Sequence, residues 1–226
     1  MKKTIFKILA IFLIGIGGGI FANHVLWPYF AERPVYITEK KEITIQENTA
    51  LKNAIEKVER TVVGIETKTK EEILYGSGLI LTSDGLVVTL AELVPKGANV
   101  SLFLDGKSIP FQILKRDLNN NLALIKVEKD NLPTVGFAAF EKIKLGERVF
   151  LVGATFEETE VKKETNEGIV KYFDKDSIRT NIFEKASLSG SPLFNIEGEV
   201  LGLNTVDSLG RVIAIPVTEI RTFAGF

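Results

Sequence analysis

The first thirty residues follow a continuous hydrophobic pattern. Three lysines within the first seven residues precede residues 8–30, a run in which His24 is the only titratable side chain apart from Tyr29. A bilayer core requires about 20 apolar residues in a helix, so the run is long enough to cross a membrane. Lysines before the run predict that the N-terminus stays inside, and the aromatic cluster that begins at Trp27 suits the membrane interface. We therefore expect a single-pass membrane anchor over residues 1–30.

A cleaved signal peptide is the competing interpretation of the same run. Ala22 could then occupy the position before the cleavage point. Ile20, two residues earlier, is a poor match to the small residue that such sites prefer, and the apolar run continues past Ala22. The sequence favours the uncleaved anchor, but both interpretations place the rest of the chain outside the membrane, in a periplasm or at a cell surface.

The hydrophobic pattern changes twice after the anchor. Residues 31–48 are mixed and charged, which indicates a linker, with a short strand expected at Ile43–Ile45. Asn48 and Thr49 are suitable helix-capping residues. Apolar residues then recur at helical spacing and give one apolar face over about three turns. The members of this face are Leu51, Ala54, Ile55 and Val58.

Beyond Arg60 the pattern consists of short runs of β-branched and other apolar residues, broken by Gly, Asp and Asn. Many short strands with almost no helical periodicity indicate a sandwich or barrels. The first series of expected strands is Thr61–Glu66, Gly78–Leu81, Leu86–Leu90, Val100–Leu104, Ile109–Leu114 and Leu122–Val127. The second series is Arg148–Ala154, Gly168–Tyr172, Ser177–Ile182, Val200–Asn204 and Arg211–Ile215. Residues 131–133, between the two series, are expected to link two halves.

Composition narrows the chemistry that the chain can perform. The net charge is −1, and the anchor holds three lysines and no acid, so the remainder carries −4 and offers no basic footprint for nucleic acid. The chain has no cysteine and one histidine, which makes a transition-metal site unexpected. The acidic stretch at residues 157–160 is expected to be a solvated hairpin face rather than a calcium loop. We expect neither a metal nor an organic cofactor.

Three segments, in chain order, resemble the HtrA (high-temperature-requirement A) branch of the trypsin-like serine proteases. Residues 76–94, GSGLILTSDGLVVTLAELV, resemble the family's GSG…DG…TNxHV element. Residues 117–127, DLNNNLALIKV, resemble the element that ends in DLAVLKV. Residues 187–205, SLSGSPLFNIEGEVLGLNT, resemble GNSGGPL followed by GEVxGxNT.

The resemblance implies an all-β fold of two antiparallel six-stranded β-barrels with a cleft between them. It covers about residues 49–217, and the domain is expected over 49–226. The barrels would take about residues 58–130 and 134–222. The peptide-binding PDZ domain that often follows in this family is expected to be absent, because the sequence ends ten residues after Pro216.

Residue by residue, the resemblance places the family's serine nucleophile at Ser189, its histidine at Glu92 and its aspartate at Asn121. Such catalysis needs a hydroxyl, a base of near-neutral pKa to take its proton, and a carboxylate to orient the base. The single histidine, His24, lies in the hydrophobic run, so no alternative alignment supplies an imidazole to the domain. A carboxylate is a weaker base than imidazole by about two pKa units.

The oxyanion hole also departs from the family pattern. The family has a glycine two residues before the nucleophile, where the backbone N–H helps to bind the oxyanion, and this chain has Ser187. A second family glycine, two residues after the nucleophile, is replaced by Ser191. Glycine reaches backbone angles that other residues avoid, so these side chains are expected to alter the loop.

These substitutions favour a protease homologue without catalytic activity that binds a polypeptide or helps an assembly. Two alternatives remain open: a serine endopeptidase that uses Ser189 with a non-standard base, and a structural envelope protein whose cleft is filled. The resemblance also implies a homotrimer, because HtrA proteins commonly trimerise through N-terminal aromatic residues. Tyr29, Phe30 and Tyr36 are the candidates, although membrane-interface anchoring explains the first two equally well.

Overall fold

The computed structural model describes residues 2–27, 47–157 and 160–226, in two units that divide at residues 45 and 46. The N-terminal unit holds helix α1 (Lys2–Phe21), which continues into the π-helical turn η1 (Ala22–Leu26). Lys3–Leu26 has a mean hydropathy of 2.3 and is long and apolar enough to cross a membrane. The expected linker lies largely outside the described residues, as do the expected strand at 43–45 and the candidate trimer residues.

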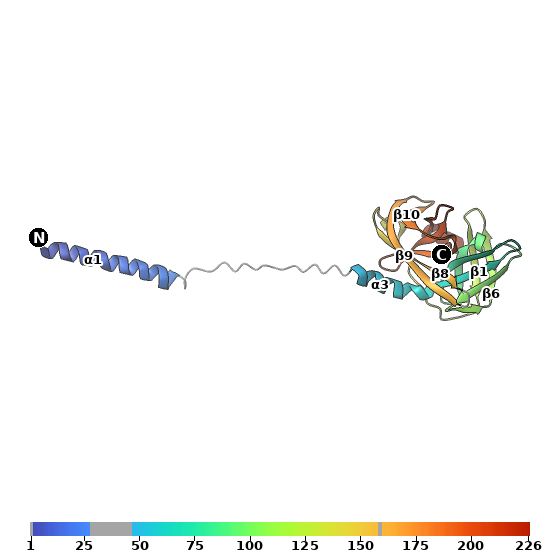
Figure 1. Cartoon of the computed structure of the whole chain (residues 1–226), viewed down its shortest axis with the longest axis horizontal. Helices are drawn as coiled ribbons and strands as arrows, with labels where there is room; N and C mark the ends of the chain where they lie inside the picture. The colour runs from blue at the N-terminus through green and yellow to red at the C-terminus, as the bar shows by residue number, and fades with distance from the viewer. Residues whose placement is uncertain (1, 28–46, 158–159) are drawn as a thin grey trace. The chain divides into compact units, whose positions relative to one another are not determined.

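The second unit is mainly β-structure and begins with helix α3 (Figure 1). Side chains of the helix's apolar face, among them Ala54 and Val58, belong to the core of the unit. Helix α3 spans Glu47–Val58, close to the expected start, and the 3₁₀ turn η2 (Glu59–Thr61) leads from it into the first strand. A final helix, α4 (Val217–Ala224), was not expected from the sequence. It follows Pro216 and stops at Gly225, whose φ of +91° is left-handed, and three of its side chains are buried. The apolar positions were too few to reveal it.

The first sheet has seven strands in the order β5-β4-β1-β2-β3-β7-β6, all antiparallel. The expected six became seven because one strand divides at Pro110, which has no N–H to donate to the ladder. The two pieces are the outermost strands of the sheet and are one residue apart in the chain, so the sheet must curl until its edges meet at Pro110. The strands are β1 (Val62–Lys68), β2 (Ile73–Ile80), β3 (Leu86–Leu90), β4 (Asn99–Leu104), β5 (Lys107–Ile109), β6 (Phe111–Asp117) and β7 (Leu122–Val127).

The second sheet is a closed barrel of six strands in the order β10-β13-β12-β11-β8-β9. One strand, β11, had been missed because it lies inside the segment assigned to the nucleophile motif. The strand β9 is much longer than expected, because its first half pairs with β8 but carries mostly polar side chains and therefore little apolar signal. The strands are β8 (Arg148–Glu157), β9 (Glu160–Phe173), β10 (Ile178–Phe183), β11 (Pro192–Asn195), β12 (Val200–Val206) and β13 (Arg211–Pro216).

Two hydrophobic clusters hold the second unit together. The larger fills the first sheet and extends into the second through Phe150 and Phe194, whose rings stack with centroids 5.4 Å apart. The smaller lies inside the barrel around Leu151 and Leu188. The expected all-β double-barrel class is confirmed, with the difference that the first sheet has seven strands. A groove lies between the two sheets, and it holds the candidate site.

Candidate functional site

The loop that carries Ser189 is fixed to strand β2 of the first sheet. It begins with the 3₁₀ turn η5 (Ala186–Leu188), and the carbonyl oxygen of Ser189 accepts a hydrogen bond of 2.9 Å from the N–H of Ser77 on β2. Gly190 has a φ of +79°, and a Cβ there would overlap the carbonyl oxygen of Ser77. Close contact between the two sheets therefore requires glycine at this position.

The hydroxyl group of Ser189 already has a partner. The side chain is buried, with 5% of its residue surface exposed, and its Oγ accepts a 3.2 Å hydrogen bond from the backbone N–H of Val206 on β12. Within the described residues, the Oγ of Ser189 makes this hydrogen bond and makes none to Glu92. The hydroxyl is thus held by a backbone donor of the second sheet.

Glu92 and Asn121 meet through a backbone contact. Glu92 is exposed on the 3₁₀ turn η3 (Ala91–Leu93), and its N–H donates a 3.1 Å hydrogen bond to Oδ1 of Asn121. The carbonyl oxygen of Asn121 accepts a second bond, also 3.1 Å, from the N–H of Ala91. Asn121 has a φ of +52°, a conformation that asparagine tolerates better than most residues. The Asn121 side chain thus caps a turn and does not orient the side chain of Glu92.

A groove of about 430 Å³ brings three of the four candidate residues together. Glu92, Ser187 and Ser189 all line it, whereas Asn121, which accepts from the Glu92 N–H, does not. The complete lining is Glu72, Ile73, Leu74, Tyr75, Glu92, Leu93, Ala186, Ser187, Ser189 and Val206. The lining carries two carboxyl groups and no basic side chain. Such a charge opposes an oxyanion, with a repulsion that water weakens because both residues are exposed.

The backbone donors of the oxyanion hole are arranged differently from the catalytic template. In that template the N–H of the nucleophile and the N–H two residues before it point at the oxyanion. Here the N–H of Ser189 donates a 3.0 Å hydrogen bond to the carbonyl oxygen of Ala186 within the 3₁₀ turn. Ser187 sits in that turn without a positive φ, which explains how a residue with a side chain fits there. One of the two donors is therefore used inside the loop.

Behind the loop, Ser191 replaces glycine without distorting the barrel. Its side chain is fully buried, and its Oγ accepts a 3.1 Å hydrogen bond from Nδ2 of Asn204. The backbone carbonyl of Asn204 in turn accepts a 2.7 Å bond from the N–H of Gly190. Sequence reasoning did not find Asn204 or the partner N–H of Val206. Every residue except proline has a backbone N–H, so the sequence does not single out that of Val206. Asn204 was noted only as a member of the GxNT motif.

The acidic hairpin stretch is described only at its ends. Glu157 and Glu160 both form ion pairs with Lys162, and the second of these is 3.9 Å long. Glu158 and Thr159 lie outside the described residues. In the described ranges no three carboxylate or imidazole groups gather as a metal site would require.

Comparison with known proteins matches residues 76–203 to the model of the trypsin-like peptidase domain. A probable periplasmic serine endoprotease DegP-like of Halomonas elongata is 29% identical over 169 residues, which are 68% of this chain and 35% of that protein. Serine protease HTRA1 of Xenopus laevis is 31% identical over 193 residues, 76% of this chain and 41% of that protein. The chain thus spans about two fifths or less of the length of these relatives.

A solved structure of the HtrA-type protease AlgW with a tripeptide shares the fold. Its TM-score is 0.69 at 24% identity, and the match covers 77% of this chain and 62% of that one. The chain belongs to the trypsin-like peptidase family, in its HtrA-type branch.

Proposed function

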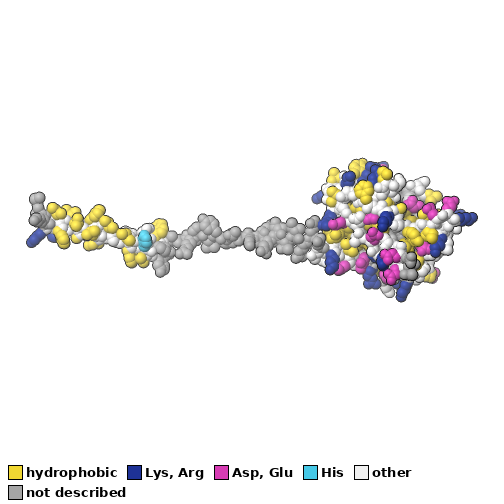
Figure 2. Space-filling view, in the orientation of Figure 1, with side chains coloured by type: hydrophobic (Ala, Val, Ile, Leu, Met, Phe, Trp, Pro, Cys, Tyr) yellow, Lys and Arg dark blue, Asp and Glu magenta, His cyan; other side chains and the backbone are white. Residues whose placement is uncertain are grey.

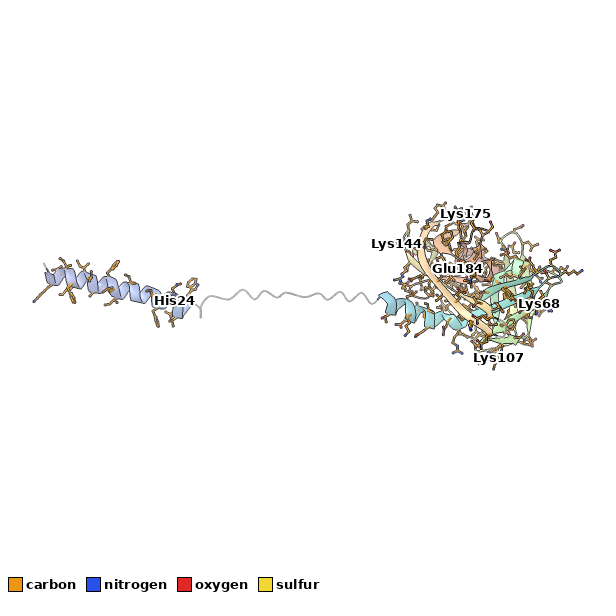
Figure 3. The ribbon with its side chains drawn as sticks, viewed as in Figure 1. His24, Lys68, Lys107, Lys144, Lys175 and Glu184 are labelled. Carbon is orange, nitrogen blue, oxygen red and sulfur yellow. The ribbon has the colours of Figure 1, made fainter. Side chains whose placement is uncertain are left out.

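We propose that this chain is a catalytically inactive HtrA-type homologue, tethered to a membrane, that binds an extended polypeptide in the groove beside Ser189. The observation that carries the proposal is the absence of an imidazole from the second unit. The only histidine is His24, which lies on the N-terminal helix (Figure 3). The position of the base holds Glu92, and the N–H of Ser189 is engaged by Ala186. Nucleophile activation and oxyanion binding both lack a required group.

The groove retains the feature that peptide binding by strand addition requires. Along β2, Ile73–Leu79 pair with β1 on one side, while β3 pairs on the other side only at Gly78–Ile80. Residues 73–75 line the groove and have no strand partner on that second side within the described chain. A free strand edge can pair with an incoming extended backbone. Backbone pairing of this kind needs no catalytic residue.

Membrane attachment follows from the N-terminal helix and is part of the same proposal. Lys3–Leu26 has the length and hydropathy of a membrane span, and the lysines at its N-terminal end favour an N-terminus that stays inside. We propose that the second unit is held outside, as the periplasmic placement in the name of one relative also suggests. A homotrimer is the assembly that the HtrA resemblance supports. Light scattering of the detergent-solubilised chain tests it.

Two assays on the full chain in detergent micelles test the function. We expect no cleavage of casein and no labelling by a fluorophosphonate probe. We also expect saturable binding to members of an array of extended peptides. A Ser189→Ala variant is the matched control, and we expect its peptide binding to be unchanged.

Each of the other outcomes selects a different function. Stoichiometric probe labelling that disappears in Ser189→Ala would show an active serine hydrolase, with Glu92 or another group as base. Absence of both labelling and peptide binding would favour a structural envelope protein.

A further inference from the structure

A second pocket, away from the groove, lies on the outer face of strands β9, β10 and β13. Its volume is about 410 Å³. Three basic side chains and no acidic one belong to its lining, which is Lys171, Tyr172, Arg179, Thr180, Arg211, Val212 and Ile213. Figure 2 shows basic side chains beside hydrophobic ones over the part of the unit where β10 lies. None of these residues takes part in the proposed peptide groove.

A β-bulge in β9 directs two neighbouring side chains to this face. Arg179 pairs with Tyr172, but the next residue of β10, Thr180, pairs with Val170, so Lys171 has no partner on β10. In a regular strand, adjacent side chains point to opposite faces. The bulge removes that alternation, and Lys171 and Tyr172 are both exposed and both line the pocket.

A second irregularity, in β10, lies beside Arg211, the third basic residue of the pocket. Arg179 pairs with Ile213 and Phe183 pairs with Arg211, so four residues of β10 advance while β13 advances two. The hydroxyl of Thr180 stabilises this bulge, because it donates to the carbonyl oxygen of Val212 (3.2 Å) and accepts from the N–H of Ile182 (3.1 Å). Two adjacent bulges thus surround one pocket, and bulges commonly re-aim side chains at functional places.

The side chains around the pocket are ordered before any ligand arrives. The guanidinium of Arg179 lies 5.4 Å from the ring centre of Tyr172, a cation–π contact. The hydroxyl of Tyr172 donates a 2.9 Å hydrogen bond to Asp174, which fixes the ring and raises the pKa of the tyrosine. Stacking leaves the edge of a guanidinium fork free to donate hydrogen bonds. Pre-ordered donors lose less entropy when an anion binds.

The charges around the pocket leave a net positive site. Asp207 pairs with Arg211 at 2.6 Å and so neutralises that cation. Within the described chain neither Lys171 nor Arg179 takes part in an ion pair. Asp174, bound to the Tyr172 hydroxyl, is a second carboxylate beside the pocket, so one net positive charge remains. A planar guanidinium and an ammonium group together match a phosphate group, which offers up to two negative charges and several acceptor oxygens.

We propose that the pocket between Lys171, Arg179 and Arg211 binds the phosphate group of a phosphate-bearing ligand. A soluble phosphomonoester and the headgroup of an anionic phospholipid share this chemistry. The site is independent of the proposed peptide groove, so failure of either proposal leaves the other standing.

Calorimetric titration of the full chain in maltoside micelles, in phosphate-free buffer, tests the site with phenyl phosphate as the probe. We expect one saturable site per chain. Lys171→Gln and Arg179→Gln should each weaken binding about tenfold or more, because each removes a charge-assisted hydrogen bond. Arg179→Lys keeps the charge but loses the fork, so its affinity should fall between those of the wild type and Arg179→Gln. A parallel titration with short-chain phosphatidic acid compares the two sources of phosphate.

Lys175→Gln is the matched control. This lysine lies in the turn between β9 and β10, close to the pocket but outside its lining (Figure 3). Its replacement removes the same charge and should leave the affinity within about twofold, since exposed charges act weakly at a distance. Equal losses for Lys175→Gln and Lys171→Gln would mean diffuse attraction and would overturn the site. Absence of saturable phenyl phosphate binding to the wild type would overturn it as well.

A measurement on the wild-type chain tests the site even if the variants fail to fold. Arginine-selective modification by phenylglyoxal, read out by mass spectrometry, should be slowed at Arg179 by phenyl phosphate. Arg60 lies outside the pocket lining and serves as the internal reference, with an unchanged rate. Equal rates at Arg179 with and without the ligand would contradict the proposal even if every variant misfolded.

Discussion

The two sides of the groove obey different constraints. On the side of Ser189, backbone bonds join the loop to β2 and β12, and Gly190 fits where no side chain could. On the side of Glu92, the side chain is exposed and only its backbone N–H is used, by Asn121. On the first side, packing between the sheets determines which residues fit. On the second side, only catalysis would require a histidine, because nothing in the packing does.

Under the proposed function, this difference explains how the loop of a protease persists without its reaction. Ser189 contributes a carbonyl oxygen to one sheet and accepts a hydrogen bond from the other, so it joins the two sheets whether or not its hydroxyl reacts. Glu92 carries no comparable structural role. Changes on the two sides should therefore differ in kind, with effects on stability on one side and on chemistry on the other.

The largest expected effect combines changes on both sides. We expect Glu92→His, Asn121→Asp, Ser187→Gly and Ser191→Gly together to give slow proteolysis of casein. Triad members act as a unit worth on the order of 10⁶ in turnover, so each single change should give none. Ser187→Gly is included because the 3₁₀ turn must open to release the N–H of Ser189, and Ser191→Gly restores the family residue behind the loop. A folded quadruple variant with no turnover on a broad peptide library would show that the groove cannot hold a substrate productively.

Gly190→Ala tests the packed side, and we expect a loss of about 3 kcal/mol or more in the free energy of unfolding. The added Cβ would overlap the carbonyl oxygen of Ser77 and would also meet Leu93. Urea denaturation followed by far-ultraviolet circular dichroism measures the loss. Gly97→Ala is the matched control, because Gly97 has a similar positive φ of +85° but open space around it. Its cost should be only the left-handed strain of about 1–2 kcal/mol. Equal costs for the two would refute the packing explanation.

Asn121→Ala tests whether the side chain on the other side is a turn cap. We expect it to cost about 1–2 kcal/mol, because the N–H of Glu92 loses its acceptor and alanine tolerates the positive φ poorly. Asn121→Asp keeps the acceptor oxygen and should change the free energy of unfolding by less than about 0.5 kcal/mol. Neither variant should cleave casein. If Asn121→Asp were as destabilising as Asn121→Ala, the cap would not be the source of the stability.

Much of the fold could be predicted from the sequence, for reasons that the structure makes clear. The strands whose side chains pack in the two cores, such as Leu86–Leu90 and Leu122–Val127, have the predicted bounds because burial imposes an apolar run. The first half of β9 was not predicted because most of its residues are polar and give no apolar run. The sequence shows a proline at position 110, but one continuous strand, Ile109–Leu114, was predicted across it where the structure has two.

The candidate site could be predicted only in part. Motif order placed Glu92, Ser187 and Ser189 in one region, and the structure puts them along one groove. The role of Asn121 as a turn cap and the use of the Ser189 N–H by Ala186 depend on backbone geometry, which no residue type reports.

The smallest expected effect concerns the turn that follows Val206 on the packed side. The carboxylate of Asp207 accepts hydrogen bonds of 2.9 Å from the N–H groups of Arg211 and Leu209. The N–H of Arg211 is the main cause that lowers the pKa of Asp207 below its usual 3.8. A carboxyl group whose pKa is lower in the folded state stabilises that state above its unfolded pKa. The contribution disappears as the pH falls through the lower, folded value.

We therefore expect Asp207→Asn to reduce the thermal midpoint of the full chain slightly at pH 6, with a difference from the wild type that stays constant down to about pH 4. Below 3.8 the difference should shrink, because the wild-type carboxyl group then also becomes neutral. Thermal melts of both chains between pH 2 and pH 7 measure it, and the subtraction cancels the titration of all other acids. Asp176→Asn, in another exposed turn, is the control. A wild-type advantage that grew on acidification would have the wrong sign and would exclude Asp207 as a stabiliser of the turn that positions Val206 beside Ser189.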